Sequence, residues 1–292
     1  MPSTSIGTGF PHASRLRRGV SLAAALALAG CAHTGKTPQP AAPAAAAAQP
    51  AAAPENAPHP VLDTKALDLL KHMGETLASA KSYSYRSHGS AEVPASTGQF
   101  LTFFAENHIT LQRPNKLRAE VGGDMPGFQI TYDGAKLWAY DPVKKFYATT
   151  DAPSTIDETL KMLMEKADIH FPAADLMGSD PYAAMSKGVT SAFIAGQSVV
   201  DGHACDHLAL MGPGVNWEIW IDSGATAVPR RLAITYKEAA NFPRYRVDFY
   251  DWKLNPKLPA SQFAFKAPKD AKQTSFESQV SQEFDAPKEG AK

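Results

Sequence analysis

Three residues with metal-binding side chains alternate along one short segment, His203, Cys205 and His207. Alternate side chains of a strand share one face, so these three would lie on one side while Leu208 and Leu210 lie on the other. Imidazole and thiolate are ligands for zinc and copper. However, side chains two residues apart in a strand are about 7 Å apart and lie in a row, so they do not converge on one ion. We therefore expect neither a metal nor another cofactor here.

The sequence contains only two cysteines, Cys31 and Cys205. If Cys31 is chemically modified, Cys205 is the one remaining thiol. An odd cysteine in an oxidising compartment suggests intermolecular pairing or redox chemistry. A small buried residue is the interpretation that we favour for Cys205, because free cysteine behaves as a small apolar side chain.

Two groups of aspartates are the candidates for acid–base catalysis: Asp201 with Asp206, and Asp248 with Asp251. Nothing in the sequence fixes the separation of the carboxylates, and no nucleophile accompanies them. The chain also lacks a serine-centred elbow, a phosphate-binding glycine loop and a metal-spaced helix motif. We therefore expect a protein that is not an enzyme.

Cys31 is the residue with the clearest chemical prediction. A cationic patch at Arg15 to Arg18 precedes an apolar run from Val20 to Ala29, which is the pattern of a secretory signal. The run leads into Leu28-Ala29-Gly30-Cys31, which resembles the bacterial lipobox, whose cysteine becomes the lipid-modified first residue. A diacylglycerol and an amide-linked acyl chain such as palmitate would then anchor the protein without a membrane span. An ordinary cleaved signal with an unmodified cysteine is the alternative.

Residues 31–60 are expected to form a tether between this anchor and the folded part. Pro38 to Pro60 contains 11 alanines and 7 prolines in 23 residues, a composition that cannot form a core. At about 3.1 Å per residue in polyproline II, the tether could span roughly 90 Å. The residue after the predicted lipid site is Ala32, whereas aspartate at that position is the usual signal for inner-membrane retention in enterobacteria. The resemblance to bacterial lipoproteins therefore implies the periplasmic face of the outer membrane of a Gram-negative bacterium.

Charge and hydropathy exclude two classes of protein. The chain carries 29 basic and 29 acidic side chains, so it is not a strongly basic nucleic-acid binder. No apolar run reaches the roughly 20 residues that a membrane-spanning helix needs. All aromatic residues except Phe10 lie at or beyond Tyr83. We therefore expect one folded domain from 61 to 277 and a polar tail from 278 to 292.

The spacing of apolar residues predicts helices and strands within this domain. A period of three or four predicts a helix from Asp63 to about Ser82, a second from Ser154 or Thr155 to Ala167, and shorter helical pieces in 172–185. A period of two predicts strands. These ten predicted strands span 99–113, 117–121, 128–132, 136–140, 189–195, 205–211, 216–222, 231–236, 245–252 and 262–266.

These elements predict an α+β fold. An antiparallel meander follows from the short connections, including the tight turn at Asp133-Gly134. A single sheet of ten strands must curl strongly or close, and helices can cap its concave face. We expect one wide antiparallel sheet curled into an incomplete β-barrel, with helices over the concave side.

Three sequence motifs resemble those of the periplasmic lipoprotein carriers LolA and LolB. They are Gln112-Arg113-Pro114-Asn115, Tyr132-Asp133-Gly134-Ala135-Lys136-Leu137-Trp138-Ala139-Tyr140-Asp141-Pro142 and Phe263-Ala264-Phe265-Lys266-Ala267-Pro268. The chain is most similar to the predicted periplasmic protein family of the same superfamily, which also includes the LppX lipoproteins. The resemblance covers residues 62 to 276 and is weakest in 151–190.

The resemblance implies a LolA/LolB-like half-barrel with a helical lid over an apolar cavity for acyl chains. In the carriers, the arginine of the Arg-Pro-Asn motif helps to hold the lid shut, and Arg113 matches it here. A guanidinium that reaches solvent past the end of the strand is the alternative. The residues expected to line the cavity share the dry faces of their strands, although a closed core would show the same pattern. They are Leu101, Phe103, Ile109, Leu111, Leu117, Phe128 and Ile130.

The leading functional hypothesis is a non-catalytic, membrane-anchored periplasmic lipoprotein. It would bind or carry the acyl chains of a lipid or lipoprotein, with no nucleic-acid partner. The competing hypothesis is an envelope interaction module that has a filled core, a protein partner and no lipid ligand.

Overall fold

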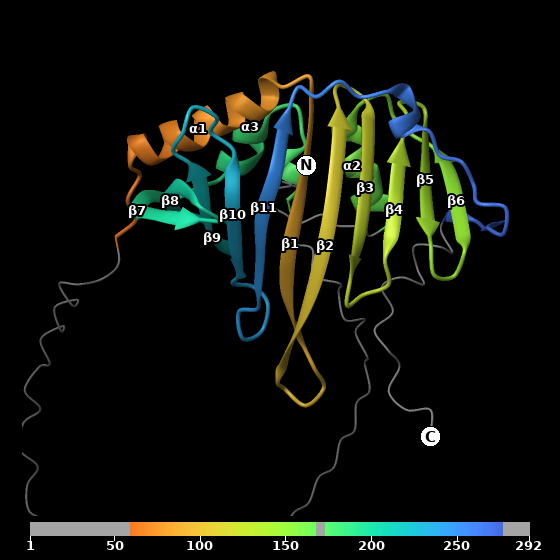
Figure 1. Ribbon diagram of the computed structural model, residues 1–292. Coiled ribbons are helices and arrows are strands. Elements are labelled where there is room, and N and C mark those ends of the chain that lie inside the picture. The colour runs from red at the N-terminus through yellow and green to blue at the C-terminus, as the bar shows by residue number, and fades with distance from the viewer. Residues whose placement is uncertain (1–58, 168–172, 277–292) are drawn as a thin grey trace, which may run out of the picture. The chain divides into compact units, whose positions relative to one another are not determined.

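The computed structural model describes residues 59–167 and 173–276 (Figure 1). The predicted signal, Cys31, the predicted tether as far as residue 58 and the predicted tail lie outside the described residues. No helix in the described part of the chain combines the length and apolar character that crossing a membrane requires.

A single sheet of twelve strands forms the domain, in the order β12-β6-β5-β4-β3-β2-β1-β11-β10-β9-β8-β7. All neighbouring strands are antiparallel except β12, which runs parallel to β6. The sheet is therefore mixed, not purely antiparallel as predicted. The strands are β1 (Ser82–Pro94), β2 (Phe100–Gln112), β3 (Lys116–Gly123), β4 (Phe128–Tyr132), β5 (Lys136–Asp141), β6 (Phe146–Asp151), β7 (Ser191–Val200), β8 (His203–Gly212), β9 (Val215–Asp222), β10 (Pro229–Tyr236), β11 (Arg244–Leu254) and β12 (Lys272–Gln273).

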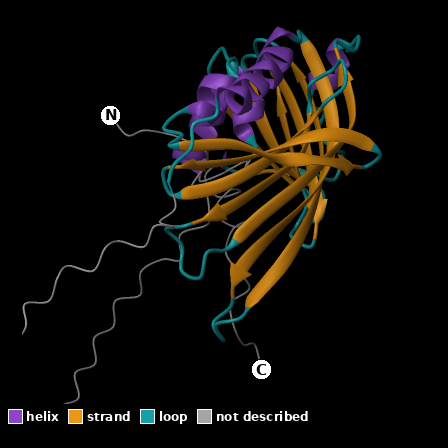
Figure 2. Ribbon diagram, turned by 90° about the vertical axis from the view of Figure 1, so that its left-hand side faces the viewer, coloured by secondary structure: helices purple, strands orange, loops and turns teal. Residues whose placement is uncertain are grey.

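The sheet curls around the helices and does not close (Figure 2). The three α-helices and the first 3-10 helix lie on its concave side, and η2 follows β11. The helices are α1 (Thr64–Ser79), α2 (Ile156–Ala167), η1 (Ala174–Leu176), α3 (Pro181–Ser186) and η2 (Ala260–Phe263). The predicted α+β fold with a wide, open and curled sheet is confirmed.

Local sequence explains where α1 begins and which face it buries. The Asp63 carboxylate accepts a hydrogen bond from the Lys65 backbone N–H and so caps the first turn. Leu70, Met73 and Leu77 recur at helical spacing and are fully buried against the sheet. The predicted helix is confirmed, although it ends at Ser79 because the backbone is already extended at Ala80.

The strand predictions were wrong in two respects: one predicted strand is absent, and three strands were not predicted. Residues 262–266 do not form a strand, because 260–263 form η2 and 264–266 belong to no strand. Strands β1, β6 and β12 were missed. On the concave side of β1, the small Ser87 and Gly89 interrupt the apolar alternation, so the period of two is weak.

The β4–β5 hairpin follows the predicted Asp133-Gly134 turn. The Asp133 carboxylate accepts hydrogen bonds from the backbone N–H groups of Ala135 and Lys136. Gly134 has φ +103°, a conformation that glycine adopts without a steric penalty. This turn fixes the register of the two strands, in which Tyr132 faces Leu137.

Candidate functional site

The concave face under the helices is a filled core. Four of the residues that were expected to line a cavity lie here: Ile109, Leu111, Leu117 and Ile130. None of them is more than 4% exposed, and they belong to the same cluster as the buried face of α1. At this end of the sheet, these side chains support the helices.

Beyond the helices, the same face continues towards the tip of the β1–β2 hairpin (Figure 1). The apolar residues of this face are interrupted where Asn107 lies opposite Ser87 and donates a hydrogen bond to its hydroxyl. They resume beyond this polar pair, where Phe103 lies opposite Ala91 and Leu101 lies opposite Val93. Phe103 and Phe128 are half-buried, whereas Leu101 is 42% exposed. The seven predicted cavity residues are thus divided between a packed end and a partly uncovered end of one face.

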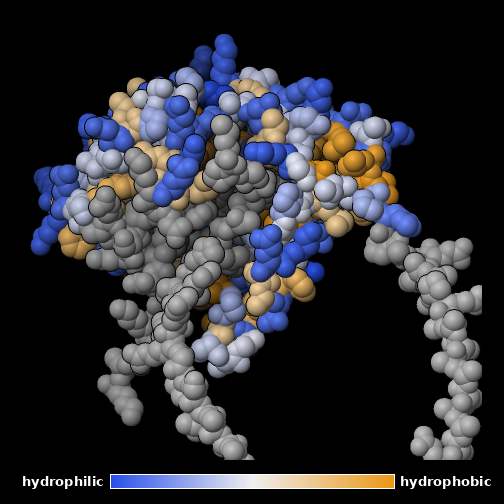
Figure 3. All heavy atoms as spheres, turned by 180° about the vertical axis from the view of Figure 1, so that it is seen from behind, coloured by the Kyte–Doolittle hydropathy of each residue, from blue (hydrophilic) through white to orange (hydrophobic). Residues whose placement is uncertain are grey.

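A second group of exposed apolar side chains lies at the β7 edge of the sheet. Val61, Leu62 and Phe193 are exposed there, next to the start of α1. Seen from behind, apolar atoms gather at this edge (Figure 3). These residues belong to the junction between the N-terminal segment and the sheet, where Leu62 pairs with Ala192.

Arg113 connects the end of β2 to the helices. Its Nη1 donates to the Met177 carbonyl oxygen at 3.2 Å, and its Nη2 donates to the Leu77 carbonyl oxygen at 3.4 Å. The guanidinium carbon lies 5.8 Å from the centre of the Tyr83 ring. The Nε atom is buried and has no hydrogen-bond partner among the described residues. A charged side chain at the edge of the core thus contacts α1 and the residue after η1.

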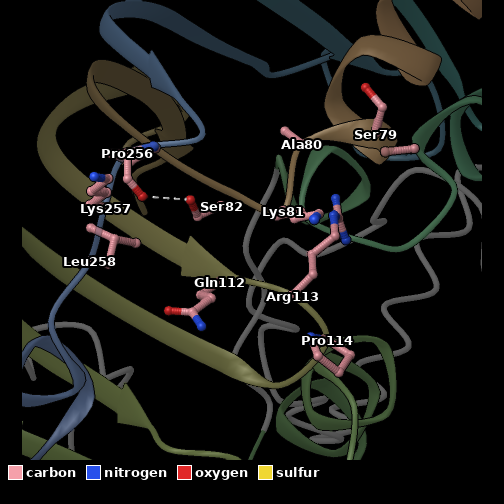
Figure 4. A pocket seen from close by; sticks show the side chains of 11 residues that line it. Ser79, Ala80, Lys81, Ser82, Gln112, Arg113, Pro114, Pro256, Lys257 and Leu258 are labelled. Carbon is pink, nitrogen blue, oxygen red and sulfur yellow. Dashed lines mark hydrogen bonds between the residues drawn. The ribbon is translucent and has the colours of Figure 1, made fainter.

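Arg113 also lines a cavity of about 590 Å³ at the junction of α1, the β1–β2 pair and the segment after β11 (Figure 4). Three of the lining residues are cationic, and none is acidic. The lining residues are Ala78, Ser79, Ala80, Lys81, Ser82, Gln112, Arg113, Pro114, Pro256, Lys257 and Leu258.

The three recognised motifs meet around the β4–β5 hairpin. A Cβ added to Gly134 would lie 2.7 Å from the Asn115 Nδ2 atom, so the Arg-Pro-Asn turn packs directly on the hairpin turn. The Phe265 ring centre lies 6.1 Å from that of Trp138 and 5.9 Å from that of Tyr140. The motifs therefore have a structural role in holding this part of the sheet together.

The residues considered for metal binding do not form a joint site. His203 contacts Asp222 at 3.1 Å, and His207 contacts Glu218 at 2.8 Å. Cys205 is fully buried, and burial raises the pKa of its thiol. Within the described residues, no three His, Cys, Asp or Glu side chains are grouped to hold a metal ion.

The aspartates considered for catalysis take part in separate structural contacts. Asp206 accepts hydrogen bonds from Gln197 and Ser223, whereas Asp248 pairs with Arg231 and Arg246. Asp201 and Asp251 have φ angles of 48° and 54°, the left-handed conformation found at turns and bulges. The structure does not assemble these carboxylates into one site.

Charged residues on the convex face stabilise one another. Burial favours the neutral form of Asp248, but hydrogen bonds from Arg231 and Arg246 outweigh it, so the pKa of Asp248 is lowered. The Arg231 guanidinium carbon also lies 5.5 Å from the centre of the Trp220 ring. The His207 ring stacks on Trp220, with 4.0 Å between the two ring centres. Sequence reasoning missed this network, because its members come from four different strands.

Several solved structures match this chain, all at low sequence identity. The lipoprotein LppX of Mycobacterium tuberculosis matches at 12% identity and a TM-score of 0.42, covering 68% of this chain and 100% of that one. LprF of Mycobacterium bovis matches at 13% identity and a TM-score of 0.38, covering 72% of this chain and 99% of that one. The MucA/MucB complex of Pseudomonas aeruginosa matches at 14% identity and a TM-score of 0.40, covering 70% of this chain and 62% of that one. Among curated proteins, none matched.

A family model matches residues 66–277, which is most of the chain and nearly all of its folded part. The family is described as predicted periplasmic protein, DUF2092. The match confirms the family resemblance that the three motifs indicated. The description also agrees with the compartment expected from the N-terminal signal. The chain belongs to the DUF2092 family of predicted periplasmic proteins.

Proposed function

We propose that this protein is a non-catalytic periplasmic lipoprotein that shelters the acyl chains of a lipid or lipoprotein on the uncovered part of the concave face. The observation that carries the proposal is the apolar stripe that Ala91, Val93, Leu101 and Phe103 form on this face beyond the helices. Aligned apolar side chains that remain partly exposed are typical of ligand-binding surfaces. The membrane attachment through Cys31 and the outer-membrane location are parts of the same proposal.

The site would consist of side chains from neighbouring strands at the open end of the sheet. Leu101 and Val93 face each other across β1 and β2, as do Phe103 and Ala91. Burial of an acyl chain stabilises a complex by about 0.8 kcal/mol for each methylene removed from water. A chain laid along this stripe would also cover the exposed part of Leu101.

Arg113 would act on the cover of this site. Its hydrogen bonds to Leu77 and Met177 join the sheet to α1 and to the segment after η1. In the proposed function, the helices and this segment form the cover, and Arg113 holds them against the sheet. Loosening of these two hydrogen bonds would admit the ligand towards the packed end.

Fluorescent fatty-acid binding to the purified full chain tests the proposal. Phe103→Ser removes an apolar side chain from the concave stripe, and we expect it to weaken binding by about tenfold. Phe104→Ser is the matched control, because Phe104 is the next residue of the same strand, points to the opposite face and is 59% exposed. The control should bind as the natural protein does.

Native mass spectrometry after detergent removal, followed by organic extraction, gives an independent measurement. A co-purified lipid that Phe103→Ser reduces and Phe104→Ser retains would support the proposal. A protein that is consistently empty and binds no fluorescent fatty acid would refute it.

The packed core under the helices favours a second candidate, an envelope interaction module without a lipid ligand. Leu111, Leu117 and Ile130 are fully buried there, so this part of the interior is already occupied by side chains. Crosslinking in cells distinguishes the two candidates. One stable protein partner together with no extractable lipid would favour the interaction module.

A further inference from the structure

We propose that residues 276–284 form an amphipathic helix that docks on the concave face between β6 and β3 and extends the cover that the other helices provide. The observation behind it is the position of Phe276, the last residue that the structure describes. Phe276 has a helical backbone, is half-buried and packs against the buried cluster under the helices. The inference does not depend on acyl-chain binding, because the segment and the surface belong to the same chain.

The path of the chain brings Phe276 to this face around the β6 edge. In the parallel β12–β6 pair, Lys272 lies opposite Phe146 and Gln273 lies opposite Tyr147. The Thr274 backbone N–H then donates to the Tyr147 carbonyl oxygen at 2.9 Å, so the chain follows β6 for one more residue. From there it turns onto the core, and the next residues continue from a point that is already fixed to the concave side.

The concave face between β6 and β3 is apolar and only partly covered. Phe128 on β4 and Val121 on β3 are direct cross-strand partners and are half-buried. Phe146 on β6 is 37% exposed, and the alternate residue Ala148 lies opposite the core residue Ala139. Alternate residues of a strand share a face, so Phe146 belongs to the same concave surface. An amphipathic helix would bury what remains exposed of these three side chains.

The sequence after β12 has the spacing of such a helix. Phe276, Val280 and Phe284 recur every four residues, and all positions between them are Glu, Ser or Gln. Thr274-Ser275-Phe276-Glu277 has the pattern of a capping box, which marks a helix start. A helix this short is only marginally stable alone in water, so it needs a surface on which its apolar stripe can pack.

The length of the segment matches the width of the surface. Three strand spacings separate β6 from β3, which is about 14 Å. Nine helical residues span about 13 Å. A helix that starts at Phe276 and crosses β5 and β4 therefore brings Phe284 to β3. Because Phe276 is already held on the surface, the rest of the segment binds intramolecularly, which favours it over a second copy with the same contacts.

Hydrogen exchange of the purified full chain tests the docking. The backbone amides of 280–284 should exchange at least about tenfold more slowly than those of an unstructured peptide. Val280→Ser combined with Phe284→Ser should abolish this protection. Gln279→Ser combined with Gln282→Ser, two serine replacements outside the apolar stripe, should retain it. All four positions lie beyond the last described residue, so the replacements leave the described core intact. Unprotected amides in the natural protein, or equal protection in the two double variants, would overturn the proposal.

Photocrosslinking identifies the surface on which the segment docks. A benzophenone amino acid in place of Phe284 keeps an apolar aromatic group at this position, and we expect it to attach to β3 or β4 of the same chain. Mass spectrometry of the digested product locates the attachment. Mixing of isotope-labelled and unlabelled protein separates attachment within one chain from attachment between two chains. Attachment to a second chain only, or to no residue of β3 to β6, would contradict the assignment.

Discussion

Arg113 shows how one side chain can join parts of the fold that are distant in sequence. Its guanidinium contacts the Leu77 carbonyl, the Met177 carbonyl and the Tyr83 ring. The family resemblance predicted that this arginine helps to hold the helical lid. It could not identify backbone carbonyls as the partners, because they depend on how α1 and η1 pack.

Replacement of Arg113 by alanine should destabilise the domain. Two carbonyl groups would lose their donor, and we expect the free energy of unfolding to fall by about 1–3 kcal/mol. Urea unfolding monitored by tryptophan fluorescence measures this loss. Arg86→Ala is the control, because Arg86 is exposed and its replacement should change the stability by less than about 0.5 kcal/mol.

Asp222 makes the stability of the protein depend on pH. Burial opposes its charge, but the Gly224 backbone N–H and the Arg230 guanidinium outweigh burial, so the pKa of Asp222 is lowered. A lowered folded-state pKa contributes stability that is fully present above the unfolded pKa of about 3.9 and is lost as the pH falls through the folded value. The stability gained from Asp222 should therefore begin to fall below about pH 4 and be lost progressively at lower pH.

Asp222→Asn tests this dependence. At pH 7 the variant should be less stable by about 1–3 kcal/mol, because it leaves the largely buried Arg230 without its carboxylate. Between pH 4 and pH 2, its stability should fall less steeply than that of the natural protein. Asp251→Asn, at an exposed position of the bulge in β11, should keep the natural slope. Parallel slopes for the natural protein and Asp222→Asn would contradict the assignment.

At the scale of elements, α1 and α3 approach closely at a glycine. A Cβ added to Gly74 would lie 2.7 Å from the Tyr182 Cβ and 2.8 Å from the Tyr182 backbone N. From sequence alone, Gly74 is only a weak point of a helix, since glycine costs about 1 kcal/mol there relative to alanine. The helix crossing that requires glycine is a tertiary feature, which local spacing does not encode.

Gly74→Ala should therefore destabilise the protein although it improves helix propensity. The gain of about 1 kcal/mol competes with displacement of the α3 backbone, which costs about 1–3 kcal/mol. We expect a net loss of about 1 kcal/mol in urea unfolding. His72→Ala, on the exposed face of the same helix, should be neutral or slightly stabilising. A Gly74→Ala variant as stable as His72→Ala would refute the close approach.

The C-terminal segment is the element in which the sequence prediction and the structure differ most. The alternation in 262–266 fits a strand, but Phe265 instead packs on Trp138, Tyr140 and Tyr147 without a ladder of backbone hydrogen bonds. The periodicity identified two apolar side chains, but only the residues after Phe263 are extended, because Phe263 belongs to η2. It could not distinguish pairing with a strand from packing on top of one, because both bury alternate side chains.

Phe265→Ala should release this segment. We expect a loss of about 1–2 kcal/mol in the free energy of unfolding, in keeping with a half-buried aromatic side chain. Hydrogen exchange should become faster in β12 and in the neighbouring strand β6. Lys266→Ala, at the exposed next residue, is the control and should leave exchange unchanged.

For the whole molecule, the decisive prediction concerns attachment to the membrane. Cys31→Ala removes the predicted lipid site, so the protein should move from the membrane fraction to the soluble periplasmic fraction and lose incorporation of labelled palmitate. Cys205→Ala changes the other cysteine, which is buried, and should leave the distribution unchanged. An unaltered distribution of Cys31→Ala would remove the anchor from the proposed function.

The predictions succeeded at the scale of the whole domain more than at the scale of the site. Apolar periodicity was sufficient for one curled sheet with helices, because a wide sheet with one dry face must cover that face. Apolar periodicity does not reveal which apolar residues of that face lie under helices. Ile109 and Leu101 share one face of one strand, yet the first is packed and the second is exposed. That difference depends on where the helices end, which is set by tertiary packing.

The bridge between the N-terminal segment and β7 has a mechanical consequence. The Asp63 backbone N–H donates to the Ala192 carbonyl oxygen at 2.8 Å, and the Ala192 backbone N–H donates to the Val61 carbonyl oxygen at 2.6 Å. Because this bridge is parallel to β7, tension along the chain before Val61 loads these hydrogen bonds in shear, and they share the force. Pulling on the N-terminal segment would therefore strain the edge of the sheet before it unwinds α1.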